Sequence, residues 1–557
     1  MKRNCDALSD TTFDVVVVGA GIYGALCAWD AVLRGLSVAL IDKGDFGGAT
    51  SSNSLKIVHG GLRYLQQLDI PRFRESVRER CIWMRIAPHL VHPLPCVMPT
   101  YGHLMKGKEV MRIGLLLNDV LGFDRNRLDD REKIIPNGKV IGKKECLRLT
   151  PFVDGKRVTG GAFWIDAQMA DSERLLLSVV LSAAGRGAQA ANHVQAKEFL
   201  VRNGRVEGVR AEDRLSGKSL DIRGRVVLNT VGGWTDELLG SGGIAGSGKA
   251  LSTAMNLVLS RNILPECAAG VYGDFEYPLP KGGSHQGRRV LFMTPWRNRT
   301  IVGTFHRAYP GKPDDLGVRE QEIEECLKEI TAAAPGEKIR REDVVFVHKG
   351  FLPMDGIHGK TGEVILTKHY RIIDHARQGG PKGLISVIGV KYTTSRDVAR
   401  RAVDRVLLAL EKSPARCETH SLPLAGGAVP DFKGYLDDAL GRWSSRYSPE
   451  IVRRLVIRYG SDLPSLLALA EKQPDLGKTV PGSKEVLYAE LEQAIRSEMA
   501  VTLSDLVFRR TDLGSAGTPA RDTIEACGRF MAKSSGWSEA RLKTEIAELA
   551  PLAKIRP

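Results

Sequence analysis

Several features are absent from this chain of 557 residues, and each absence narrows the possible functions. The nine cysteines are scattered, odd in number and without a Cys-x-x-Cys pair, which argues against a disulfide framework and against a cysteine-based metal site. No apolar run reaches the ~18 residues of a membrane-spanning helix. The first residues, MKRNCDALSDTT, lack the apolar core of a secretory signal. We therefore expect a cytoplasmic protein with no metal ion that meets a membrane only at its surface.

The overall composition is that of a folded water-soluble protein, with 43% hydrophobic and 26% charged residues. Its length predicts two or three domains. Lys and Arg number 80 against 65 Asp and Glu, a net charge of +15 that suits nucleic acid, an anionic membrane or an anionic small molecule. Because no basic tail or RNA-binding signature is present, we expect no nucleic-acid partner.

The chain begins with a pattern typical of dinucleotide binding, FDVVVVGAGIYGALCAWDAVLRGLSVALIDKGD. Val15–Val18 predicts a strand buried in a parallel sheet. Gly19, Gly21 and Gly24 follow as G-x-G-x-x-G, which gives a tight turn, close approach of a pyrophosphate, and close packing of helix on strand. The helix expected over 22–34 would direct its N-terminus at the phosphates.

A carboxylate follows at the position that such a site requires. A second strand, Ser37–Ile41, ends at Asp42, where an acid can accept both hydroxyls of the adenosine ribose. The same charge would repel the 2′-phosphate of NADP. The small and polar run GDFGGATSSNS then favours FAD over NAD, because it suits contacts along an extended dinucleotide. Its expected contacts are Thr50, Ser51 and Ser52.

The stretch 49–65, ATSSNSLKIVHGGLRYL, places a histidine, two glycines and a cation close together. His59 can serve as the base that removes a hydroxyl proton, or it can bond the backbone around the flavin. The glycines would let the backbone pass close to a ring. Arg63 can bind a phosphate with two hydrogen bonds, or it can be an ordinary surface cation. Tyr64 can donate its hydroxyl or form a wall of the site.

A third segment has the pattern of a strand that leads into a helix. Leu384–Val390 predicts the strand, and a helix is expected from about Ser395. Thr393 or Thr394 can cap that helix, whose N-terminus would face the electron-rich side of a reduced flavin. Lys391 would add positive charge there, or it would be a surface lysine at the start of a capped helix.

The motifs GAGIYG, ATSSNSLKIVHGGLRYL and SVIGVKYTTSRDVARRAVD together resemble those of the FAD-dependent glycerol-3-phosphate dehydrogenases, which are D-amino-acid-oxidase-like flavoproteins. FWIDAQMADSERLLL (163–177), VVLNTVGGW (226–234) and residues 484–514 extend the resemblance over nearly the whole chain. It implies an α/β fold: a Rossmann-type FAD-binding domain, an antiparallel β-sheet substrate cap, and a helical C-terminal domain. It also implies that Gly232 and the backbone of Val194 contact FAD.

The expected FAD-binding domain spans 12–411 and is interleaved with cap pieces at about 96–154 and 246–354. The expected C-terminal domain spans 412–557. Its predicted helices are 449–459, 463–471, 484–499, 502–509, 519–534 and 538–549, with Thr502 and Ser538 as plausible caps.

The resemblance implies oxidation of sn-glycerol 3-phosphate to dihydroxyacetone phosphate, with hydride passing from C2 to flavin N5. Two arginines of the family's phosphate site are replaced here, by Leu352 in GFLP and by Lys368 in TKHY. Lys368 and Arg307, with His306 beside it, are candidates to restore positive charge. Another polyol phosphate, or a hydroxy or amino acid, therefore stays open as the substrate.

The expected electron acceptor is a quinone, with oxygen as the alternative. Residues 106–123 combine lysines with an apolar stripe, so this segment either lies in a membrane interface on the inner face of the cell membrane or packs on the cap. A homodimer is among the expected assemblies. Arg509 and Arg510 could touch the flavin domain, and a structural ion pair is the favoured interpretation.

Overall fold

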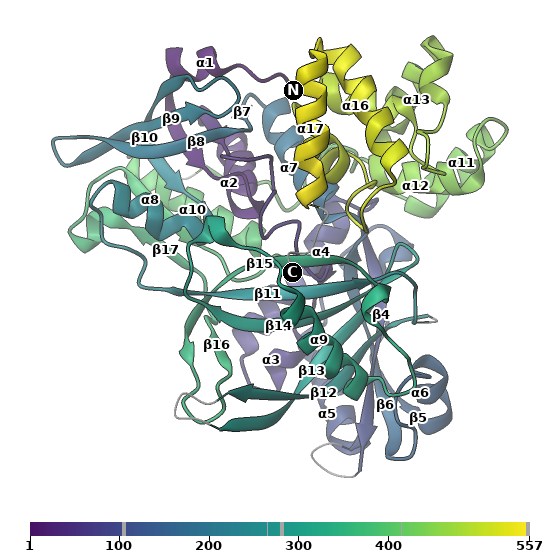
Figure 1. The fold of residues 1–557 in the computed structure, drawn as a ribbon. Coiled ribbons are helices and arrows are strands. Elements are labelled where there is room, and N and C mark those ends of the chain that lie inside the picture. Colours follow the sequence, from purple (N-terminus) through teal and green to yellow (C-terminus); the bar gives the residue numbers. More distant parts are fainter. Residues whose placement is uncertain (103–106, 265, 279–282, 414, 553–557) are drawn as a thin grey trace.

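The computed structural model describes the chain except residues 103–106, 265, 279–282, 414 and 553–557. Figure 1 shows two β-sheets and a group of helices. The sheet that contains β10 lies at the upper left, the second sheet fills the lower half, and the C-terminal helices lie at the upper right.

The first sheet is mainly parallel, with the order β17-β18-β10-β1-β2-β7. Its centre is β1 (Thr12–Val18), which pairs in parallel with β2 (Val38–Ile41) and β10 (Ser219–Asn229). Helix α2 (Ile22–Leu33) joins the first two strands and is almost wholly buried, as expected for a crossover helix between parallel strands. The remaining strands are β7 (Gln189–Ala191), β8 (Val194–Arg202), β9 (Arg205–Asp213), β17 (Arg371–Asp374) and β18 (Leu384–Ile388).

Helices pack on this sheet. A continuous core joins α2 to α7 (Ser172–Gly185) and α10 (Ser395–Ala409) through Val, Leu and Ala side chains. The other helices of the first 250 residues are α1 (Cys5–Asp10), α3 (Leu62–Leu65), α4 (Ile70–Ile86), α5 (Lys108–Leu121), α6 (Lys143–Leu149) and α8 (Thr235–Ser241).

The second sheet has the order β16-β15-β11-β14-β13-β12-β4-β6-β3, with β5 beside β6, and helix α9 (Glu320–Ala333) packs against it. Its strands are β3 (Ile57–Val58), β4 (Val91–Tyr101), β5 (Lys139–Gly142), β6 (Val158–Met169), β11 (Ala250–Leu259), β12 (Ala268–Pro278), β13 (Ser284–Trp296), β14 (Arg299–Tyr309), β15 (Val344–Ile357) and β16 (Val364–Leu366).

Three strands of this sheet, β3, β6 and β16, lie wholly outside the ranges expected for the cap. β6 was expected in an FAD-binding segment, but it pairs antiparallel with β4 from Val91 to Tyr101. This long ladder satisfies the backbone of both strands and joins β6 to the cap sheet. Lys106, at the start of the expected interface segment, lies outside the described residues.

The C-terminal region is helical, as the sequence predicts. Thr502 Oγ1 accepts a hydrogen bond from Asp505 N at 3.1 Å, and Ser538 Oγ accepts one from Arg541 N at 3.2 Å, so both predicted caps form. The helix over 432–443 was not predicted. The helices are α11 (Phe432–Trp443), α12 (Pro449–Tyr459), α13 (Leu463–Lys472), α14 (Tyr488–Ser497), α15 (Leu503–Asp505), a π-helical turn (Leu506–Arg510), α16 (Arg521–Ser535) and α17 (Glu539–Leu552).

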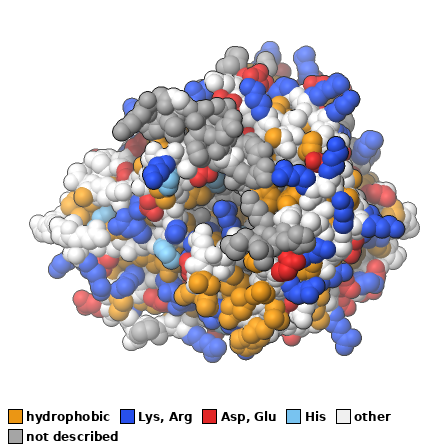
Figure 2. Space-filling model, turned by 90° about the horizontal axis from the view of Figure 1, so that it is seen from below, with side chains coloured by type: hydrophobic (Ala, Val, Ile, Leu, Met, Phe, Trp, Pro, Cys, Tyr) orange, Lys and Arg blue, Asp and Glu red, His pale blue; other side chains and the backbone are white. Residues whose placement is uncertain are grey.

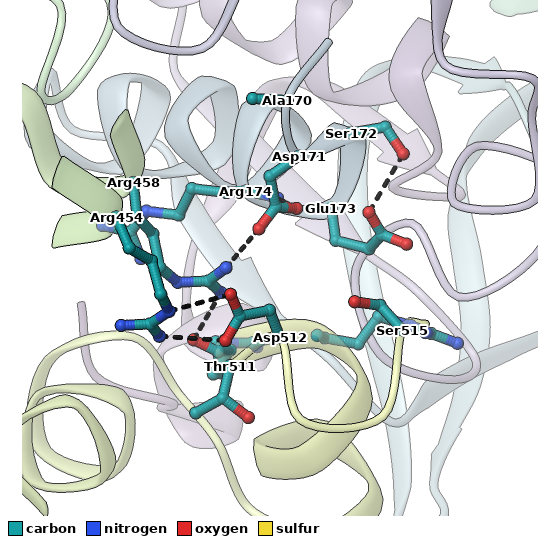
Figure 3. A network of polar contacts seen from close by, with 12 residues as sticks. Ala170, Asp171, Ser172, Glu173, Arg174, Arg454, Arg458, Thr511, Asp512 and Ser515 are labelled. Carbon is teal, nitrogen blue, oxygen red and sulfur yellow. Dashed lines mark hydrogen bonds and ion pairs between the residues drawn. The ribbon is translucent and has the colours of Figure 1, made fainter. Parts of the chain in front are cut away.

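A buried ionic network joins the three parts of the molecule (Figure 3). Asp171, at the start of α7, pairs with Arg458 of α12 and, at 2.8 Å, with Arg297 of the β13–β14 turn. Arg454 pairs with Asp512 at 2.9 Å. Burial alone would raise the pKa of Asp171, but the charges of Arg458 and Arg297 hold it below its usual value. The carboxylate therefore stays ionised and fixes the C-terminal helices against both sheets.

Candidate functional site

A cavity of about 1050 Å³ lies between the two sheets. On one side it is lined by the turn after β1 and the end of β2, including Gly19 and Asp42. On the other side it is lined by cap strands, including Asn256 of β11 and His306 of β14. The site therefore lies at the carboxyl ends of the parallel strands, where ligands bind in open α/β sheets.

The glycine-rich turn has no room for side chains. Gly19 has φ +95°, and a Cβ on it would lie 2.9 Å from Thr230 O. A Cβ on Gly24 would lie 1.9 Å from Gly19 O, so this glycine allows α2 to pack on the turn. Ser51 Oγ accepts a hydrogen bond from Ile22 N at 2.9 Å in the first turn of α2. The cradle fits the diphosphate of a dinucleotide.

Asp42 lies at the end of β2 and lines the cavity. Its carboxylate accepts hydrogen bonds from Ala20 N at 2.7 Å and Gly44 N at 2.9 Å. Burial raises the pKa of Asp42 to about 6, although these two bonds oppose the shift. Val194 N donates to Asp42 O at 2.7 Å, so Val194 and the acid lie together where an adenosine would bind. Gly232 lines the same cavity with φ +60°.

The small polar residues Thr50, Ser51 and Ser52 differ in their contacts. Thr50 and Ser51 line the cavity, and Thr50 Oγ1 also accepts a hydrogen bond from Phe351 N of β15 at 2.9 Å. Ser52 is not among the lining residues. Its hydroxyl donates to Gly47 O at 2.8 Å and so closes the loop on itself. The predicted role of Ser52 as a direct cofactor contact has no geometric support.

His59, Tyr64 and Lys391 come together beside the cavity, although Lys391 is more than 300 residues distant in sequence. The ring centres of His59 and Tyr64 lie 5.7 Å apart, and Lys391 Nζ lies 4.6 Å from the centre of the Tyr64 ring. Lys391 lines the cavity, and its Nζ has no hydrogen-bond acceptor among the described residues. Burial lowers the pKa of Lys391 to about 8. The Tyr23 hydroxyl fixes its backbone, donating to Lys391 O at 2.6 Å.

The loop that carries His59 is held by an aspartate to which the sequence analysis gave no role. Asp166 of β6 accepts hydrogen bonds from Gly60 N at 2.5 Å, Arg80 Nη1 at 2.8 Å and Trp164 Nε1 at 2.9 Å. The only sequence signal was its place in the segment FWIDAQM. Burial and the charge of Lys391 lower the pKa of His59, so the imidazole is neutral at pH 7.

The predicted substrate cations do not all face the cavity. Arg307 is directed away from it and pairs with Glu325 of α9, because alternate residues of β14 face opposite sides of the sheet and His306 takes the cavity side. Lys368 is exposed and is absent from the cavity lining, whereas Leu352 is part of it. Arg63 on α3 is exposed and is likewise absent from the cavity lining, and no carboxylate pairs with it among the described residues. The pKa of His306 is lowered mainly by burial, then by the charge of Arg289, and least by the charge of Arg63.

The threonines after Lys391 do not cap α10 as predicted. Thr394 occupies the N-cap position, but its hydroxyl makes no bond to the helix. Its ψ of 8° is outside the extended region that capping residues normally adopt, so the hydroxyl is not directed at the first N–H groups. Thr393 is buried, and its carbonyl accepts a hydrogen bond from Trp83 Nε1 at 2.9 Å.

Two family models match the chain. Residues 14–391 match the FAD-dependent oxidoreductase family, and residues 417–542 match the C-terminal domain of alpha-glycerophosphate oxidase. The first match covers the two sheets, and the second covers most of the C-terminal helices.

Individual proteins match over almost their whole length. The chain is 32% identical over 519 residues to a glycerol-3-phosphate dehydrogenase of Synechocystis, covering 91% of this chain and 90% of the relative. It is 30% identical to the aerobic glycerol-3-phosphate dehydrogenase of Staphylococcus epidermidis, covering 92% and 88%. Its fold is similar to that of a glycerol-3-phosphate dehydrogenase from Bacillus halodurans solved with FAD, with a TM-score of 0.75, 25% identity and coverage of 99% and 96%.

Proposed function

The chain belongs to the FAD-dependent glycerol-3-phosphate dehydrogenases, and from this membership we propose that it oxidises sn-glycerol 3-phosphate to dihydroxyacetone phosphate. The observation that carries the proposal is the cluster of His59, Tyr64 and Lys391 beside a cavity built on a dinucleotide-binding turn. The relatives favour this substrate over a hydroxy or amino acid.

The residues present fit FAD. The N-terminus of α2 would receive the pyrophosphate, Asp42 the adenosine ribose, and Val194 the adenine. When bound, FAD supplies the acceptor for the hydride that leaves C2 of the substrate. Lys391, whose Nζ has no hydrogen-bond acceptor among the described residues, would hold positive charge at the flavin end of the cavity.

His59 is the candidate base. A neutral imidazole can accept the proton of the C2 hydroxyl, and the depressed pKa of His59 keeps it neutral at pH 7. Asp166 fixes the backbone of the adjacent Gly60, so the position of the imidazole does not depend on a flexible loop. Tyr64 lies edge-on to the imidazole and limits its rotation.

Arg63 is the proposed phosphate ligand. It is exposed and has no carboxylate partner among the described residues, and its charge contributes to the lowered pKa of His306, which lines the cavity. A guanidinium matches a phosphate with two parallel hydrogen bonds. Because Leu352 contributes no charge, binding would depend heavily on Arg63.

Electron transfer to a membrane quinone is the second part of the proposal. No described helix is both long and apolar enough to cross a membrane. However, the side chains of Ile113, Leu116, Val120 and Phe123, on and just after α5, are 59%, 62%, 61% and 72% exposed. Figure 2 shows hydrophobic side chains gathered on the lower face, where α3 and α5 lie in Figure 1. Such a surface suits the interfacial layer of a bilayer. A protein bound there would lie close to the quinones that are dissolved in the membrane.

Product analysis tests the oxidation. With a soluble dye as acceptor, sn-glycerol 3-phosphate should yield dihydroxyacetone phosphate, and glycerol should yield no product. R63A should retain FAD and raise the KM roughly tenfold to a hundredfold, the effect of losing one charge-assisted contact. R529A, which removes an exposed cation on α16, should leave the KM unchanged. Equal KM values for R63A and R529A would remove Arg63 from the phosphate site.

Flotation with anionic phospholipid vesicles tests the membrane contact. The native chain should float, and the double variant I113E/L116E should remain at the bottom of the gradient. L408E is the matched control, since Leu408 is 58% exposed on α10, and it should float. Flotation of I113E/L116E would refute a role for α5.

A further inference from the structure

The C-terminal helical region contributes directly to the cofactor cavity. Thr502, Ser504, Asp505 and Arg509 line the same cavity as the glycine-rich turn near residue 20. These four residues lie on α15, just before it, and on the π-helical turn that follows. The cavity is therefore closed by segments that are about 480 residues apart in sequence.

Two buried contacts hold this segment at the adenosine end. Arg510 donates to Asp45 Oδ1 at 2.7 Å and to Oδ2 at 2.5 Å, so the ion pair expected for Arg510 is confirmed. His193 Nε2 lies 3.1 Å from both carboxylate oxygens of Asp505. Asp45, His193 and Asp505 are close enough to share a cation, but Arg510 and the His193–Asp505 contact already engage them. The cluster serves to attach the C-terminal region.

Arg509, unlike Arg510, has no carboxylate partner among the described residues. Its Nη2 donates to Gly48 O at 3.2 Å, and its Nη1 donates to Phe508 O at 3.1 Å. Two other cations that line the cavity are neutralised, Lys43 by Asp314 and Lys249 by Asp355. The Arg509 guanidinium therefore brings an uncompensated positive charge to the cavity.

The segment that Arg509 contacts runs beside the first turn of α2. Gly47 N donates to Ala20 O at 3.0 Å, and Ser51 Oγ accepts from Ile22 N at 2.9 Å. Gly48 lies between these two contacts. The first turn of α2 and the guanidinium of Arg509 thus flank one short stretch of the cavity, where the diphosphate of a dinucleotide would lie.

We propose that Arg509 binds the pyrophosphate of FAD, so that the C-terminal region completes the cofactor site. The proposal rests on FAD being the cofactor and is independent of which alcohol is oxidised. An anion placed there would accept charge-assisted hydrogen bonds from the guanidinium. Exchange of FAD would then require the C-terminal segment to move away from the cavity.

The test measures cofactor affinity without substrate. FAD release from the holoenzyme is followed by the rise of flavin fluorescence, and ADP and adenosine are compared as competitors of FAD rebinding. R509M should weaken the binding of FAD and of ADP roughly tenfold to a hundredfold, since each contains the diphosphate. Adenosine lacks it, so its affinity should change less than about twofold, within the usual effect of a distant surface substitution.

Two further variants keep the test decisive. R509K retains the positive charge and should bind ADP more tightly than R509M does. R496M removes a cation of α14 that pairs only with Glu492 among the described residues, and it should bind FAD as the native chain does. Unchanged ADP affinity in R509M, equal losses for ADP and adenosine, or equal ADP affinities of R509K and R509M would each overturn the proposal. None of these results would bear on oxidation of glycerol 3-phosphate.

Discussion

Lys391 gives the sharpest prediction for the chemistry, because its charge changes within the working pH range. Burial lowers its pKa to about 8, so the ammonium is present below that pH and is lost as the pH rises through it. For a pKa of about 8, the charged fraction falls from roughly nine-tenths at pH 7 to roughly one-tenth at pH 9. If the cation at the flavin end of the cavity promotes hydride acceptance, the rate of flavin reduction should fall about tenfold over this interval.

Anaerobic stopped-flow measurement of flavin absorbance at saturating substrate gives this rate. K391M should be slow and should show no decline between about pH 7 and pH 9. K391R is the matched variant, because a guanidinium stays protonated throughout, and its rate should also be independent of pH over this range. A decline in K391M equal to that of the native chain would show that another group titrates and would refute the reasoning.

Three other substitutions test the framework of the site. G24A would place a methyl carbon 1.9 Å from a backbone oxygen and should abolish FAD binding, whereas G114A, with no neighbouring atom within 4 Å, should retain the yellow colour on purification. R458M leaves Asp171 with one fewer buried partner and should lower the free energy of unfolding by about 3–5 kcal/mol in urea titration; an unchanged midpoint and slope would contradict the role of the network. D166A should lower kcat by up to ~100-fold with FAD content unchanged, because the His59 loop loses the oxygen that accepts the hydrogen bond from Gly60 N; an unaltered kcat would exclude that role.

The local structure of the cofactor site was predictable because it depends on neighbouring residues. The valine run, three glycines and Asp42 occupy the positions predicted for them, since one βαβ unit determines both the turn and the acid. The family and the fold class were also predicted and are confirmed by the matches over residues 14–391 and 417–542.

Contacts between distant segments were harder to predict. Arg307 was chosen as a substrate ligand, but strand alternation gives the cavity side to His306, and β14 has no clear polar–apolar pattern from which to read the face. Asp166 reaches the His59 loop because β3 pairs antiparallel with β6, a pairing of distant segments that no local pattern predicts. Helix α11 was missed because its N-cap, Asp431, follows a proline- and glycine-rich connector.

The measurement that tests the central claim most directly is anaerobic bleaching of the protein's flavin absorbance near ~450 nm, where oxidised flavin absorbs. We expect sn-glycerol 3-phosphate to bleach it rapidly and glycerol to leave it unchanged. Such a result would show that the chain oxidises the phosphate ester despite Leu352. An FAD-containing protein that neither compound bleaches, or that both bleach equally, would contradict the proposed function.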